Sequence, residues 1–135
     1  MTIEWNDELR LGVPEMDDQH QKLIALLNQF YAAVERGERE EGIMALLEGV
    51  DRYTVYHFSA EEQFMEQIGY PDLEPHRKIH LAFRQEYLAT VERHKGGDRK
   101  AIRDLVASLL SWLYTHINKT DRRYATFFQK QAGGG

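Results

Sequence analysis

Histidine is the residue type in this sequence with the most chemical information, because six occur in a chain that has no cysteine. Without thiolates the chain has no means of forming disulfides, cysteine-bound iron–sulfur clusters or cysteine zinc sites. Imidazole and carboxylate groups remain as metal ligands, and together they suit iron, zinc, copper or nickel. The positions of these groups relative to the apolar residues therefore decide whether a metal site is present.

Five His and two carboxylates fall on the apolar stripes of the segments that contain them. His57 precedes Glu61 by four residues, and His76 precedes His80 by the same spacing. Residues four apart lie on one face of a helix, so each pair is expected to point the same way. The complete set of inward ionisable residues is His20, His57, Glu61, His76, His80, His116 and Asp121.

A bound metal accounts for such a set better than ordinary packing does. One His on an apolar face is commonly a hydrogen-bonded core residue, but burying even one unpaired carboxylate costs several kcal/mol. Seven buried ionisable groups need a compensating charge, which a metal centre supplies. Five imidazoles, two bridging carboxylates and one bridging oxo or hydroxo group would fill all but one position on two octahedral metals. The open position would accept a small ligand.

Four helices are predicted to hold these groups. Apolar residues recur at gaps of three and four, the period of an amphipathic helix, and Gly or Pro follows the predicted ends. Asp17 and Asp18 are expected to cap the first helix, and Asp98 the fourth. Short turns between long helices favour an all-α, up-down-up-down antiparallel four-helix bundle. The predicted single domain spans 1–131, with an N-terminal arm at 1–16, helices at about 18–37, 40–68, 72–94 and 98–128, and a disordered tail at 132–135.

The fourth helix should be irregular. His116 and Asp121 are five residues apart, which turns them about 140° from one another on a regular α-helix. Both reach one metal pair only if the helix is distorted near residues 118–120, for example by a π-type turn. Of the other ionisable residues, His94 fits no ligand position and is expected to be structural or exposed. Glu62 is expected to face solvent or a neighbouring helix.

Charge and hydropathy exclude other classes of protein. The net charge is −5 and the sequence pI is near 5.7, which argues against a nucleic-acid binder. The mean hydropathy is −0.59, and no apolar run approaches the roughly 20 residues of a transmembrane span. The first residues lack an export signal. We therefore expect a cytoplasmic protein that does not bind nucleic acid and has no transmembrane segment. We also expect a monomer.

At this level of detail the sequence resembles the hemerythrin family, specifically its single-domain bacterial members. The resemblance covers residues 3–124, including Trp5 and Asp7 in the arm. The matching motifs are Asp17-Asp18-Gln19-His20, His57-Phe58-x-x-Glu61-Glu62-x-x-Met65, His76-x-x-x-His80-x-x-Phe83 and Trp112-Leu113-x-x-His116-Ile117-x-x-x-Asp121-x-x-Tyr124.

The resemblance implies a non-haem di-iron centre that binds O₂ reversibly. One iron would take His76, His80 and His116, and the other would take His20 and His57. Glu61, Asp121 and an oxo or hydroxo group would bridge the two irons, and O₂ would bind at the iron with two His. The residues that match the family's apolar wall around O₂ are Leu23, Phe58, Trp112, Leu113 and Ile117.

The implied function is oxygen transport, storage or delivery, with an O₂-consuming enzyme as recipient, and not enzymatic turnover. Alternatives are O₂ sensing, a di-iron oxidase, a scavenger of peroxide or nitric oxide, and iron storage. The His-rich ligand set favours a carrier, because ferritin-like di-iron enzymes use mainly carboxylates.

One pocket position departs from the family. Tyr114 stands where family members usually carry an aliphatic residue, two places before His116. It also lies seven residues before Asp121, about two turns of an α-helix, so both are expected on one face. We therefore expect Tyr114 to narrow the O₂ pocket and to hydrogen-bond there; the alternative is a hydroxyl that points to solvent.

Overall fold

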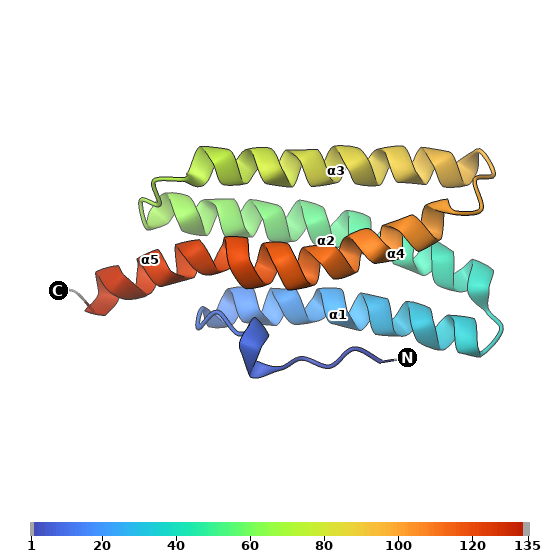
Figure 1. Ribbon diagram of the computed structural model, residues 1–135, viewed down its shortest axis with the longest axis horizontal. Helices are drawn as coiled ribbons and strands as arrows, with labels where there is room; N and C mark the ends of the chain where they lie inside the picture. The colour runs from blue at the N-terminus through green and yellow to red at the C-terminus, as the bar shows by residue number, and fades with distance from the viewer. Residues whose placement is uncertain (1, 134–135) are drawn as a thin grey trace.

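The computed structural model describes residues 2–133, which form antiparallel helices side by side (Figure 1). The first three predicted helices are α1 (Pro14–Glu35), α2 (Arg39–Gln67) and α3 (Leu73–Lys95). The fourth is divided into α4 (Ala101–Ser111), η2 (Trp112–Asp121) and α5 (Arg122–Gly133). The prediction of an all-α four-helix bundle with an N-terminal arm is confirmed. None of the helices within residues 2–133 is both long and apolar enough to span a bilayer.

The arm is shorter than predicted, because α1 begins at Pro14 instead of residue 18. Proline suits the first turn of a helix, where a backbone N–H would have no partner within the helix. Asp17 therefore does not cap α1. Its two carboxylate oxygens accept the backbone N–H groups of Leu11 and Gly12, at 2.8 and 3.1 Å, and so tie the arm to the helix. The exposed Asp18 lies within α1, so it does not cap the helix either.

The other end of the chain also differs from expectation. Asp98 does not cap the fourth helix: its carboxylate accepts the Lys100 N–H at 2.9 Å in the turn before α4 begins at Ala101. Helix α5 continues to Gly133, so residues 132–133 of the predicted disordered tail are helical. Residues 134–135 of that tail lie outside the described residues.

The predicted irregularity in the fourth helix is confirmed as the π-helical segment η2. A π-helix bonds each N–H to the carbonyl five residues earlier, so residues five apart stack on one face. The distortion is longer than the predicted region at residues 118–120, and it contains both His116 and Asp121.

Along each of three helices, the chain passes from one apolar cluster, through an ionisable layer, to another apolar cluster. In α2 the order is Phe58, Glu61, Met65, and in the fourth helix it is Ile117, Asp121, Tyr124. In α1 the same layers appear in reverse, from Met16 past His20 to Leu23. The ionisable residues are thus enclosed by apolar packing on both sides.

Candidate metal centre

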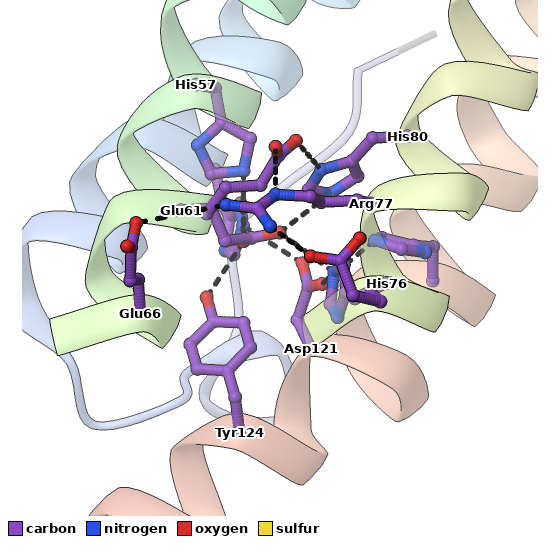
Figure 2. Close-up of polar contacts among 12 residues, drawn as sticks. His57, Glu61, Glu66, His76, Arg77, His80, Asp121 and Tyr124 are labelled. Carbon is purple, nitrogen blue, oxygen red and sulfur yellow. Dashed lines mark hydrogen bonds and ion pairs between the residues drawn. The ribbon is translucent and has the colours of Figure 1, made fainter. Parts of the chain in front are cut away.

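The structure brings all seven predicted ligand residues together. His20 comes from α1 and His116 from η2. The other five are labelled in Figure 2: His57 and Glu61 from α2, His76 and His80 from α3, and Asp121 from η2. Each of the seven is at most 5% exposed.

The side chains divide into two groups that could each hold a metal ion. Within each group the candidate ligand atoms lie within 4.8 Å of one another. The first group is Glu61, His76, His80, His116 and Asp121, and the second is His20, His57, Glu61 and Asp121. Both carboxylates belong to both groups, as the bridging positions implied by the resemblance require.

Each carboxylate directs its two oxygens to different groups. Oε1 of Glu61 lies 3.1 Å from His76 Nε2 and 2.9 Å from His80 Nε2. Its Oε2 lies 3.2 Å from His57 Nε2 and 3.4 Å from His20 Nε2.

Asp121 repeats this arrangement from the opposite side of the cluster. Its Oδ1 is 3.0 Å from His76 Nε2 and 2.9 Å from His116 Nε2, whereas its Oδ2 is 3.3 Å from His20 Nε2. The π-helical winding of η2 is what brings His116 and Asp121, five residues apart, into contact.

The donor atoms fit bound cations better than they fit one another. Nε2 of His20 and Nε2 of His57 face each other at 3.0 Å. His116 Nε2 and both oxygens of Asp121 are buried and make no hydrogen bond within residues 2–133, although the two residues approach to 2.9 Å. Lone pairs that converge on a common point without hydrogen-bonding are the arrangement of metal ligands, and a cation removes the cost of burying them.

The close approach of these buried groups shifts the pKa values of the His residues in the metal-free protein. Burial alone lowers the pKa of His20 and of His76, but the carboxylates of Asp121 and Glu61, within 3.4 Å of each ring, raise both pKa values to about 9. Burial dominates at His57 and lowers its pKa. The cluster without metal therefore holds protons that a cation must displace.

Both carboxylates stay ionised in this environment. Burial raises the pKa of Glu61, but the charge of His57 and hydrogen bonds from neighbouring imidazoles outweigh burial and lower the pKa well below its usual value. At Asp121, burial and the charge of Glu61 are outweighed by His116 and His20, so the pKa is lowered too. The two negative charges are thus available to bound cations.

A second layer of polar residues orients the ligands. His57 Nδ1 donates to Gln19 Oε1 at 2.6 Å, and His80 Nδ1 donates to Glu62 Oε2 at 2.8 Å. These bonds leave Nε2 of each ring unprotonated and directed to the cluster, a common arrangement around metal-bound His. Tyr124 donates from its hydroxyl to Glu61 Oε2 at 2.8 Å (Figure 2).

Sequence reasoning missed these orienting roles. Glu62 does face a neighbouring helix, α3, as one of the two expectations for it stated, but its contact with His80 was not foreseen. The available signal was adjacency: Gln19 directly precedes His20, and Glu62 directly follows Glu61.

Aromatic rings line the cluster. Phe58 stacks on His80 with 4.0 Å between ring centroids, and Trp112 stacks on His116 at 3.6 Å. The remaining apolar residues predicted for the pocket are completely buried: Leu23, Leu113 and Ile117.

Tyr114 is the exception among the predicted pocket residues, because its side chain is 47% exposed. The expectation that it narrows a buried pocket is therefore wrong. The prediction assumed α-helical winding, whereas η2 is π-helical from Trp112 to Asp121. More residues per turn mean that a spacing of seven no longer places Tyr114 on the face of Asp121. His94, in the last turn of α3, is half-buried and belongs to neither ligand group.

Comparison with known proteins agrees with this geometry. Residues 11–128 match the Hemerythrin HHE cation binding domain. The chain is 33% identical to a bacteriohemerythrin of Stenotrophomonas maltophilia, over 90% of this chain and 78% of the relative. It is 32% identical to a bacteriohemerythrin of Pseudomonas aeruginosa, over 89% and 77%, and 28% identical to one of Clostridium acetobutylicum, over 89% and 96%. With a buried His and carboxylate cluster and a domain match over most of its length, this chain belongs to the hemerythrin family of cation-binding proteins.

Proposed function

We propose that this protein binds O₂ reversibly at a non-haem di-iron centre, for oxygen transport, storage or delivery to an O₂-consuming enzyme. The observation that carries the proposal is the pair of ligand groups that share Glu61 and Asp121 but differ in size, with five residues in one and four in the other. Two shared carboxylates support two cations held close together. The smaller group leaves more coordination positions for an external ligand.

The seven ligands of the proposed centre are His20, His57, Glu61, His76, His80, His116 and Asp121. When bound, two iron ions, with a bridging oxo or hydroxo group, would supply the electrons for reversible O₂ binding. The protein's own contribution is to direct Nε2 of the imidazoles to the cluster, keep both carboxylates ionised, and exclude water. Gln19 and Glu62 perform the first task for His57 and His80 through their contacts with the Nδ1 atoms. Apolar residues, such as Leu23 and Ile117, perform the last.

The ligand composition supports a carrier over an oxidase. Five imidazoles and two carboxylates contrast with the carboxylate-rich sites of ferritin-like di-iron enzymes. Neutral imidazoles stabilise high-valent iron less than carboxylate anions do. The residues around the cluster are also mainly apolar and aromatic, so the pocket favours holding a ligand over proton-coupled turnover.

An optical experiment on the iron-loaded protein tests the proposal. Protein loaded with iron under argon should show two iron ions per chain by metal analysis. Ligand-to-iron charge-transfer bands should appear in air, vanish under vacuum, and return over repeated cycles. The Glu61→Gln variant serves as the control that should not cycle. One-way oxidation in air, or continuous O₂ consumption with a reductant, would contradict a carrier and point to an oxidase.

A further inference from the structure

Tyr53 carries a buried hydroxyl for which residues 2–133 provide no partner. The residue is 8% exposed, and its hydroxyl makes no hydrogen bond with any residue from 2 to 133. Two other buried tyrosines differ: Tyr87 donates to the Leu47 carbonyl at 2.6 Å, and Tyr124 donates to Glu61. An unsatisfied buried hydroxyl costs stability, so its presence calls for an explanation.

The position of Tyr53 connects it to the smaller ligand group. It lies one helical turn before His57 on α2, and its ring stacks on the His57 ring with 5.0 Å between centroids and 14° between planes. The outer side of Tyr53 borders a surface groove of about 380 Å³ between α1 and α2. The residue therefore separates this groove from the His20 and His57 end of the cluster.

A phenolic hydroxyl donates a hydrogen bond in its ordinary neutral form. Tyr53 carries this donor beside the cluster, since its ring is in stacking contact with the His57 ring. Of the apolar residues predicted for this pocket, Leu23, Phe58, Leu113 and Ile117 have no side-chain hydrogen-bond donor.

Building on the proposed function, we propose that the Tyr53 hydroxyl donates a hydrogen bond to the small ligand that binds at the His20 and His57 end. The four-residue group is where an external ligand finds more free positions, and Tyr53 carries an unpartnered hydroxyl beside it. Tyr53 thereby favours ligands whose outer atoms accept hydrogen bonds, such as O₂ that has taken up electron density or a small anion. The hydroxyl makes no hydrogen bond within residues 2–133, so it is free to bond to such a ligand.

Azide binding to the oxidised, iron-loaded protein tests this proposal directly. Tyr53→Phe removes only the hydroxyl and should raise the azide dissociation constant about two- to tenfold, the effect of one hydrogen bond. The azide stretching band should shift in the same variant, while iron content stays unchanged. Tyr87→Phe is the matched control and should leave both readouts at wild-type values. Equal azide affinity and an unshifted band in Tyr53→Phe would overturn the proposal.

A second measurement uses the metal-free protein and needs no bound ligand. Because the Tyr53 hydroxyl has no partner, Tyr53→Phe should leave the urea midpoint unchanged or raise it, whereas Tyr87→Phe should lower it. An equal loss of stability in both variants would show that Tyr53 has a structural partner, and the proposal would be wrong. Failure of wild-type protein to bind O₂ reversibly would instead refute the proposed function, since azide binding and urea unfolding do not depend on it.

Discussion

The two ends of the ligand cluster differ in what surrounds them. At the end with three His, His80 is stacked against Phe58 and bonded to the carboxylate of Glu62. At the end with two His, His57 is bonded to the neutral amide of Gln19 and stacked against Tyr53. The first end offers five ligand residues and the second offers four.

The two ends are therefore suited to two different tasks, which are holding the metals and exchanging the ligand. Both ends have a stacked His, but a charged partner holds its ring more firmly than a neutral amide does, and together with five ligand residues this favours tight metal binding at the three-His end. Fewer ligands and an unpartnered donor leave room for a molecule that must enter and leave. We infer that the three-His end anchors the centre and that the two-His end exchanges ligand.

Removing a shared carboxylate should have the largest effect, because it acts on both ends. Glu61→Gln keeps the shape of the side chain but removes the charge between the groups. It should weaken retention of both metals by more than about 100-fold, because loss of a ligand exceeds the 10- to 100-fold cost of losing an orienting partner. Iron per chain after dialysis against a chelator measures this. Glu66→Gln, on the exposed side of the same helix, is the control; equal retention in both variants would refute bridging.

Removing one His from each end should separate the two metals. His57→Ala leaves the five-residue group intact and should yield protein with one tightly held metal. His80→Ala removes a ligand from the anchoring end and should lower the affinity of the metal retained. Metal titration monitored by calorimetry gives the number of sites and their affinities. Identical titration curves for the two variants would contradict a division of tasks.

Removing the Glu62 carboxylate should weaken metal binding less than removing a ligand does, but by a measurable amount. Glu62→Ala removes the acceptor of the His80 Nδ1–H and should weaken metal binding at the three-His end by about 10- to 100-fold. Gln19→Ala should have its effect at the two-His end. Competition with a colorimetric chelator measures the affinity of each metal site. An effect of Glu62→Ala on the two-His site alone would contradict the assignment of Glu62 to the three-His end.

Stability of the metal-free protein should depend on pH in both directions. His20 and His76 have pKa values near 9, above the ordinary 6.5, so their contribution is complete below pH 6.5 and is lost as pH rises through 9. Glu61 and Asp121 have lowered pKa values, so their contribution is lost as pH falls below the ordinary carboxylate range. His57, with a lowered pKa, makes stability rise as pH increases toward 6.5 and adds no pH dependence above that value.

Urea unfolding of metal-free protein between pH 4 and 10 measures the balance. Stability should be greatest near pH 6.5 and should decline toward pH 9, because His20 and His76 lose their protons over that range whereas His57 is already neutral in the folded and the unfolded protein. A midpoint that rises steadily from pH 6.5 to 9 would contradict the protonated state of His20 and His76.

Tyr114 should give the smallest effect, because its side chain is exposed and lies apart from the cluster. Tyr114→Leu should leave metal content, O₂ release and the rate of oxidation in air close to wild-type values. Optical spectra followed over time are sufficient. A clear change in O₂ release would mean that Tyr114 reaches the pocket in solution.

Much of the fold and of the site was accessible from local pattern. The helical periodicity, the Gly and Pro positions, and the inward spacing of His57 with Glu61 are properties of short segments, so they can be read without knowing the fold. Even the distortion of the fourth helix followed from one spacing, because residues five apart meet only when the winding changes.

The sequence by itself thus determined the helical bundle and which seven ionisable residues point inward, since both depend on neighbours close along the chain. Only the tertiary structure decided the rest, because those features depend on contacts between distant segments or on the extent of the distortion. In the tertiary structure Asp17 accepts a hydrogen bond from the arm instead of capping α1, and Tyr114, in the π-helical segment, is exposed to solvent. The tertiary structure also placed Glu62 on His80, and left the Tyr53 hydroxyl buried beside His57 without a partner.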